Sequence, residues 1–247
     1  MPAPDGLLSQ LLGLFDDLDA YALEAARKPQ FELKPDGSLV TPTDREIEVI
    51  LREKLAPIAP GATVWGEEYG YEPPVDAGFW LIDPIDGTSN FVHRVPLWGI
   101  TAAFYQGGRM TAGVISLPSL GQRMWASEGE GAFLNGERMP QIRPGKVEEF
   151  ELIGHNEFSA VRERSWPGRS RHLGSFVSEF ALFAQGSFRA MTSTRVRLYD
   201  AAAGIVIARE IGAEIKHWDG RDFDESEWVE PKRVQPFVFM PPGSGLV

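Results

Sequence analysis

Cysteine is absent from this chain of 247 residues. Its absence excludes disulfides, thiol nucleophiles, iron–sulfur clusters and cysteine-bound zinc, so any chemistry depends on oxygen and nitrogen atoms. Basic residues are outnumbered, with 24 Lys and Arg against 35 Asp and Glu and a formal net charge of -11. This excess of acid argues against a nucleic-acid polymer as a partner, because such binding needs a basic face.

Long apolar runs are also missing. No run approaches the ~20 residues that span a bilayer, and the first residues lack the basic start of a signal peptide. Hydrophobic residues nevertheless make up 43% of the chain, which is too many for a disordered protein and enough for a substantial core. We therefore expect a globular, cytoplasmic protein that does not associate with membranes.

Helices are predicted in both halves of the chain. Apolar residues recur at helical spacing over roughly the first 25 residues, and Pro29 is expected to close this helix. The same spacing returns over residues 44–55, where Asp44 is placed to cap the helix. Two further helix-like stretches are 175–185 and 200–211.

Strands are predicted between these helices. Residues 63–70 and the run from Phe79 are β-prone; both end in carboxylates, and Pro84 is expected to stop the second strand. Short β-prone runs separated by Gly-containing turns over 99–143 predict an antiparallel meander. Beyond about residue 145, predicted strands and helices alternate along the chain, which indicates an α/β arrangement. We expect an N-terminal α+β half, residues 1–145, and a C-terminal α/β half, residues 146–247.

The most informative stretch covers residues 83–91 and reads Asp-Pro-Ile-Asp-Gly-Thr-Ser-Asn-Phe. Pro84 holds Asp83 extended, while Gly87 permits a sharp bend that directs the next amides at one spot. The alternative is an ordinary turn, because Asp-Pro and Asp-Gly are common turn dipeptides with solvated acids. Three other acidic positions are equally open to a role as caps or surface charges: Thr43-Asp44, Glu67-Glu68 and Tyr199-Asp200.

In combination these motifs resemble the inositol monophosphatase family of magnesium-dependent, lithium-sensitive phosphatases. The specific part is DPIDGT-N-F at 83–91 followed far downstream by D-x-A-A-G from Asp200. The resemblance implies an α/β (α+β) fold, a five-layer αβαβα sandwich of the inositol monophosphatase and fructose-1,6-bisphosphatase type. Homodimers are common among such proteins. Shorter matches run in order along most of the chain: Lys34 with residues 40–44, Gly66-Glu67-Glu68 and residues 171–175.

The resemblance further implies hydrolysis of a small-molecule phosphate monoester with two or three Mg²⁺ ions. One ion would contact Glu67, Asp83 and the carbonyl of Ile85. A second would be held by Asp83, Asp86 and Asp200, and a third would lie near Glu67. Cations are needed because two unit charges ~4 Å apart cost about 4 kcal/mol at an effective dielectric of 20, so carboxylates alone repel phosphate. Mg²⁺ prefers hard oxygen ligands of this kind.

Catalytic roles follow from the same resemblance. A metal-activated water attacks in line without a phosphoenzyme, and the catalytic candidates are Glu67, Thr88 and Asp44. Thr88, oriented by Asp44, accepts or relays the proton of the water. Lys34 and Glu68 are supporting residues. The expected contacts to substrate and phosphate are Asp86, Gly87, Thr88, Gly174, Ser175 and Asp200.

Several positions depart from the inositol-specific pattern. Ser193 stands where those enzymes have a Glu seven residues before the downstream Asp, and Tyr199 replaces a Trp. Phe176 occupies a position where a small residue is common, and helix breakers after residues 237–240 indicate that the last helix is missing. Inositol, histidinol, fructose-1,6-bis- and 3′-phosphoadenosine phosphates all stay open as substrates, with a small sugar or polyol phosphate favoured.

Other interpretations explain these residues less well. An acidic cation-binding regulatory protein without catalysis would not need Thr88 beside Asp44. An EF-hand fails because no contiguous loop carries its ligands. The four histidines lack metal-ligand spacing and are expected to be structural, and Trp218-Asp219-Gly220 is expected to form a hairpin turn.

Overall fold

The computed structural model describes residues 6–72, 75–157, 162 and 164–247 and contains five longer helical segments and two short 3₁₀ helices within those ranges. The helices are α1 (Gly6–Ala25), α2 (Pro42–Ile58), α3 (Thr88–Val92), α5 (Phe176–Ala184) and α6 (Leu198–Glu210), with 3₁₀ turns at Pro118–Leu120 and Glu225–Trp228. A small hairpin joins β1 (Glu32–Leu33) to β2 (Leu39–Val40).

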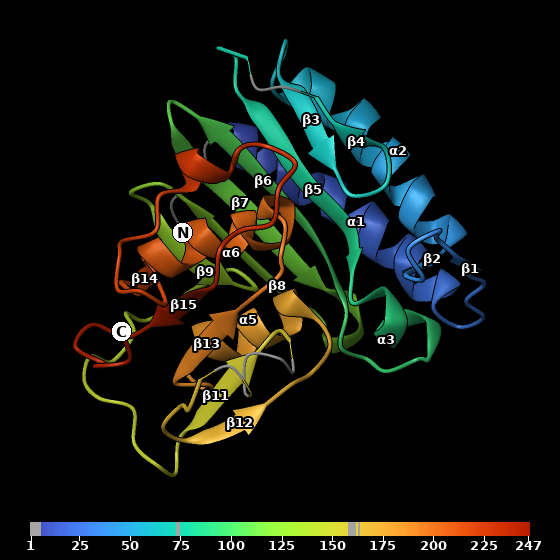
Figure 1. Cartoon of the computed structure of the whole chain (residues 1–247). Helices are drawn as coiled ribbons and strands as arrows, with labels where there is room; N and C mark the ends of the chain where they lie inside the picture. Colours follow the sequence, from blue (N-terminus) through green and yellow to red (C-terminus); the bar gives the residue numbers. More distant parts are fainter. Residues whose placement is uncertain (1–5, 73–74, 158–161, 163) are drawn as a thin grey trace.

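The remaining strands form two sheets (Figure 1). The larger consists of β3 (Thr63–Gly66), β4 (Gly70–Tyr71), β5 (Phe79–Asp86), β6 (Gly99–Gln106), β7 (Arg109–Leu117), β8 (Gln122–Ser127), β9 (Gly131–Leu134) and β10 (Glu137–Arg138) in the order β10-β9-β8-β7-β6-β5-β3-β4. The smaller consists of β11 (Leu152–His155), β12 (Arg169–Arg171), β13 (Ala190–Ser193), β14 (Glu214–His217) and β15 (Phe237–Met240) in the order β12-β11-β13-β15-β14. This arrangement confirms the expected α/β class.

Helices cover both faces of the larger sheet, which explains why its central strands are apolar throughout. Side chains alternate between the two faces of a strand. On β5, Trp80 and Ile82 pack against residues of α1 and α2, whereas Phe79 and Leu81 pack against residues of α5 and α6. Each fully buried Leu or Phe contributes roughly 1.5–3 kcal/mol to stability. The buried face of α1 is Leu8, Leu11, Phe15, Leu18 and Ala22.

The smaller sheet packs on the other side of α5 and α6, so these two helices lie between the sheets (Figure 1). Phe237 and Phe239 of β15 face this shared core. Val238 and Met240, which point the opposite way, belong to a small outer cluster with Leu246 and Trp166. Side chains of this outer cluster therefore pack on the face of the smaller sheet that points away from α5 and α6.

The first helix ends at Ala25, as predicted for roughly the first 25 residues, and Lys28 N donates to Ala25 O at 3.2 Å in a tighter turn before Pro29. Two other local expectations were wrong. The N-cap of α2 is Thr41 and not Asp44, which lies three residues inside the helix and completes a capping box. Pro84 does not stop β5, because the pairing with β6 is already interrupted by a bulge there and no ladder amide is lost.

Other predictions are confirmed. The meander over 99–143 exists as β6 to β10, and the Trp218-Asp219-Gly220 segment forms a turn closed by the hydrogen bond from His217 N to Arg221 O. Residues 241–247 contain no helix. None of the helices in the described ranges has the length and apolar character needed to cross a membrane.

His155 on β11 is structural, as expected, and gives a testable pH dependence. Its ring lies between Thr192 Oγ1 at 2.6 Å and Ser170 Oγ at 3.0 Å, and burial lowers its pKa from 6.5 to about 4. Between pH 6.5 and 4, His155 is therefore protonated in the unfolded chain but neutral in the native protein. The stability that the protein has above pH 6.5 decreases as the pH falls through this range. In His155→Gln, the melting temperature should fall less steeply across this window; identical slopes would contradict the assignment.

Candidate functional site

Four carboxylates converge at one end of the larger sheet. Asp83 and Asp86 lie at the end of β5, and Glu67 follows β3. Because β3 and β5 are parallel neighbours, with Gly66 opposite Ile82, their ends meet at the same edge. Asp200 comes from the first turn of α6, which packs on this sheet.

The electrostatics of Asp83 show how close these groups are. Asp83 is 2% exposed, and its pKa is raised well above its usual range, first by burial and then by the charges of Glu67, Asp86 and Asp200. Burial also raises the pKa of Asp200, and the neighbouring Glu67 and Asp86 raise it further. The cluster thus concentrates negative charge in a buried place, which favours a bound cation.

The chain bends sharply after Asp86. Gly87 has φ 84°, a left-handed conformation that strains other residues, and a Cβ there would lie 2.8 Å from the Cβ of Ser175. Asp86 accepts hydrogen bonds from the Ser175 hydroxyl and, at 3.0 Å, from the amide of Val177. Ser175 also caps α5 through the amide of Ser178. Asp86 therefore joins the end of β5 to the start of α5.

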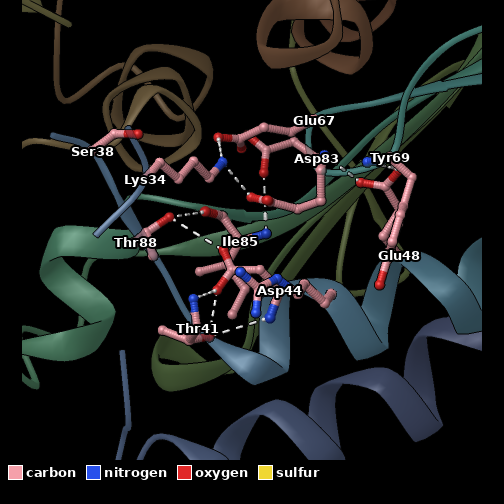
Figure 2. A network of polar contacts seen from close by, with 12 residues as sticks. Lys34, Ser38, Thr41, Asp44, Glu48, Glu67, Tyr69, Asp83, Ile85 and Thr88 are labelled. Carbon is pink, nitrogen blue, oxygen red and sulfur yellow. Dashed lines mark hydrogen bonds and ion pairs between the residues drawn. The ribbon is translucent and has the colours of Figure 1, made fainter. Parts of the chain in front are cut away.

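Thr88 and Asp44 lie side by side, as expected (Figure 2). Thr88 Oγ1 is 3.3 Å from Asp44 Oδ1 and 3.0 Å from the carbonyl oxygen of Ile85. The other oxygen of Asp44 accepts a 2.9 Å hydrogen bond from the amide of Thr41, and the Thr41 hydroxyl also contacts it. Burial raises the pKa of Asp44 to about 6. The capping box of α2 therefore fixes a carboxyl group against the Thr88 hydroxyl.

Lys34 holds the acidic turn after β3. Its Nζ lies 3.3 Å from Glu67 Oε1 (Figure 2). The same nitrogen lies 2.7 Å from Glu68 Oε1. Burial raises the pKa of Glu67 to about 7, against the opposing effect of Lys34. The predicted supporting role of Lys34 and Glu68 thus has a geometric basis in an ion pair beside Glu67.

Glu48 fixes the same turn from below and was missed by the sequence analysis. Its carboxylate accepts hydrogen bonds from Glu68 N at 2.7 Å, Tyr69 N at 3.1 Å and Arg52 Nε at 3.0 Å. A side chain at Gly66 would collide with it, because a Cβ there would lie 2.1 Å from Glu48 Oε1. The only signal in the sequence was its place one helical turn after Asp44.

A cavity of about 330 Å³ lies over the carboxylate cluster. The sequence-predicted residues that line it are Glu67, Asp83, Ile85, Asp86, Gly87, Thr88, Gly174, Ser175 and Asp200. Asp44, Lys34 and Glu68 are not among the lining residues. Asp44 contacts Thr88, Lys34 contacts Glu67, and Glu68 contacts Lys34. Ser193 is wholly buried and does not line the cavity either.

The donor set fits a hard cation. Within the described ranges, no three His, Asp or Glu side chains already surround a common metal position. The lining residues nevertheless include the four clustered carboxylates and Ile85. Burial raises the pKa of Asp83, Asp86 and Asp200, and neighbouring carboxylates raise that of Asp83 and Asp200 further. Oxygen donors of this type match Mg²⁺ rather than zinc.

Comparison with known proteins decides the family. The model of the inositol monophosphatase family matches residues 20–237. The chain belongs to the inositol monophosphatase family. This phosphatase is 34% identical over 206 residues to a histidinol-phosphatase of Mycobacterium tuberculosis, covering 77% of this chain and 78% of that one. It is 31% identical over 191 residues to a fructose-1,6-bisphosphatase/inositol-1-monophosphatase of Thermotoga maritima, covering 74% and 73%.

Solved structures show the same fold. The inositol monophosphatase (IMPase) of Thermotoga maritima superposes with a TM-score of 0.82 at 27% identity, covering 94% of this phosphatase and 91% of that chain. An IMPase/NADP phosphatase solved with Mg²⁺ and phosphate superposes with a TM-score of 0.80 at 22% identity, covering 93% and 88%.

One wall of the cavity in this phosphatase was not predicted. Asn156, Glu157, His172, Arg195 and Val196 line it in addition to the expected residues. They follow the parallel strands β11 and β13 or precede α5. The usable signal was the general rule that ligands bind beyond the carboxyl ends of parallel strands.

Proposed function

We propose that this chain is a Mg²⁺-dependent phosphatase that hydrolyses a small-molecule phosphate monoester by in-line attack of water. The observation that carries the proposal is one cavity whose wall combines Glu67, Asp83, Asp86 and Asp200 with the hydroxyl of Thr88. A cation-binding protein needs the carboxylates but not a hydroxyl held by Asp44. The family relation and the relatives named as phosphatases support the same conclusion.

Two or three Mg²⁺ ions are expected at the carboxylates. One ion would be held by Glu67, Asp83 and the Ile85 carbonyl. Another would be held by Asp86 and Asp200, with Asp83 as the ligand common to both ions. When bound, Mg²⁺ supplies charge neutralisation for the phosphate and the leaving oxygen, and it lowers the pKa of bound water. The related IMPase/NADP phosphatase solved with Mg²⁺ and phosphate supports this choice of ion.

Thr88 and Asp44 are assigned to the proton of the attacking water. The Thr88 hydroxyl can donate one hydrogen bond, either to Asp44 or to the Ile85 carbonyl. The lone pairs of its oxygen can then accept a hydrogen bond from the attacking water. Asp44, with a pKa of about 6, is close to the range in which a group both takes and returns a proton near neutrality. Gly87, Gly174 and Ser175 border the place proposed for the phosphate.

The alcohol part of the substrate is proposed to be a small sugar or polyol. Histidinol phosphate is a second candidate because relatives from Mycobacterium tuberculosis and Streptomyces coelicolor are named histidinol-phosphatases. We extend the proposal to a cytoplasmic homodimer, which sedimentation and fractionation would test. Limited proteolysis would test the division into halves at residue 145.

A phosphate-release screen tests the proposal. Inositol, histidinol, sugar and 3′-nucleotide phosphates are incubated with the protein, with and without Mg²⁺. Release of phosphate that depends on Mg²⁺ is expected for at least one ester. If none is hydrolysed although the protein binds Mg²⁺, the enzyme assignment fails and a regulatory cation-binding protein is the better account.

Glu48→Gln should weaken Mg²⁺ binding by about ten- to a hundredfold, a usual range for residues that orient metal ligands. A single amide oxygen must then serve two backbone amides and Arg52, so the turn carrying Glu67 loosens. The Mg²⁺ dissociation constant and hydrogen exchange at the amides of Glu68 and Tyr69 check this. Glu46→Gln on the exposed face of α2 is the matched control. Faster exchange with unchanged Mg²⁺ affinity would limit Glu48 to a purely structural role.

A further inference from the structure

The wall of the cavity formed by residues after β11 and β13 contains a cation that has no partner among the described residues. Arg195 lines the cavity and is exposed. Its guanidinium makes no hydrogen bond or ion pair with any residue in the described ranges. The other arginine nearby, Arg197, donates instead to the carbonyl of Pro231 and is not part of the wall.

The backbone holds Arg195 in an unusual conformation. Its φ is 60°, in the left-handed region that side chains other than glycine rarely adopt. Both neighbours are fixed: the amide of Thr194 donates to Asn156 Oδ1 at 2.7 Å, the Thr194 carbonyl accepts from Asn156 Nδ2 at 2.9 Å, and the Val196 carbonyl accepts from Val234 N at 2.8 Å. Backbone strain of this kind persists where the surroundings impose it and is concentrated at functional sites.

The histidine on this wall, unlike Arg195, has a carboxylate beside it. His172 Nδ1 lies 2.8 Å from the His155 carbonyl and 3.4 Å from Glu179 Oε1. The pKa of His172 is raised mainly by Glu179 and further by the charge of Glu157. Arg195 forms no such contact with any described residue.

Resting on the proposed function, we infer that Arg195 determines specificity by binding an anionic group on the alcohol part of the substrate, at a distance from the ester that is cleaved. A phosphate or a carboxylate provides the required chemistry, because the guanidinium donates two parallel hydrogen bonds to either. The small sugar or polyol proposed above would therefore carry a second, anionic group, because a neutral polyol would leave this cation unused. The ammonium group of histidinol would face Arg195 unfavourably.

Matched substrate pairs test the inference. Fructose 1,6-bisphosphate is compared with fructose 1-phosphate, and 3-phosphoglycerate with glycerol 3-phosphate, in the presence of Mg²⁺. The wild-type protein should have the higher kcat/KM for the anionic member of at least one pair, and the pair that shows it tells whether phosphate or carboxylate is bound. Arg195→Asn, which tolerates the left-handed backbone, should lower kcat/KM for that member by about ten- to a hundredfold through KM. The neutral member should change by less than about twofold, the level expected when no contact is lost.

Control variants make the result specific. Arg195→Lys should restore part of the preference because the charge remains, and Arg171→Gln, which removes an exposed cation outside the cavity wall, should leave it intact. Equal loss on both members of a pair, no loss on either, or a preference of the wild type for neutral or cationic esters would overturn the inference. If no ester at all is hydrolysed with Mg²⁺, the proposed function itself has failed.

Discussion

Asp83→Asn should lower Mg²⁺-dependent phosphate release by at least about a thousandfold, which corresponds to ~4 kcal/mol of lost transition-state stabilisation. Asp83 is the central carboxylate of the cluster, since Glu67, Asp86 and Asp200 all act on its pKa. The substitution removes one negative charge and one ligand oxygen, so the cations that neutralise the phosphate are held less tightly. Initial rates across a range of Mg²⁺ concentrations, with calorimetric titration of Mg²⁺, measure the effect.

Folding provides the control for this variant. The pKa of Asp83 is raised in the native protein, so folding disfavours its ionised form when no metal is bound. Asp83→Asn removes this unfavourable charge, and its melting temperature without Mg²⁺ should equal or exceed that of the wild type. Asp219→Asn, in the exposed turn after β14, should retain full activity. Activity of Asp83→Asn within tenfold of the wild type would remove the metal assignment.

Thr88→Ala is expected to lower kcat by roughly 10²- to 10⁴-fold, the range for loss of a positioned proton-transfer group. The Mg²⁺ affinity should change little, because the hydroxyl contacts Asp44 and the Ile85 carbonyl and is not one of the carboxylates. Thr88→Ser keeps the hydroxyl and should retain most of the activity. Separate measurement of kcat and of the Mg²⁺ dissociation constant distinguishes the two effects.

Coupling between Thr88 and Asp44 gives a second check on this role. If the two side chains act as one unit, Thr88→Ala combined with Asp44→Asn should cost little more than the worse single variant. Asp44→Asn alone also alters the capping box of α2, so the melting temperature of this variant must be compared with that of the wild type. The opposite outcome for Thr88→Ala, a loss of Mg²⁺ affinity with kcat preserved, would show that the hydroxyl serves the metal and not the proton.

The motif at 83–91 predicted the centre of the site because local chemistry encodes it. Gly87 is required where the chain bends, and a strand of apolar residues carries Asp83 to the sheet edge. The pairing of β3 with β5, which brings Glu67 beside Asp83, is a long-range contact that no local pattern specifies. The position of Asp200 likewise depends on α6 packing against the sheet, and it was predicted only through the family resemblance.

The parts that sequence reasoning missed depend on tertiary structure. Glu48 had no signal beyond its place one helical turn after Asp44, because its partners, the amides of Glu68 and Tyr69, lie 20 and 21 residues away. Arg195 is one of many charged residues in the sequence, and only its place on the cavity wall distinguishes it. Pro84 was misinterpreted because a proline usually removes a hydrogen bond from a regular pair of strands. In β5 the proline lies in a bulge, where the regular pairing with β6 is already interrupted.

Glu67, Asp83, Asp86 and Asp200 are expected to bind divalent cations jointly in one cavity. Crystals soaked with Mn²⁺, whose anomalous scattering marks its position where Mg²⁺ would bind, test this directly. We expect an anomalous peak within coordinating distance of Asp83, Asp86 and Asp200, and a second beside Glu67 and Asp83. Peaks found only elsewhere, or none at these carboxylates at saturating Mn²⁺, would contradict it.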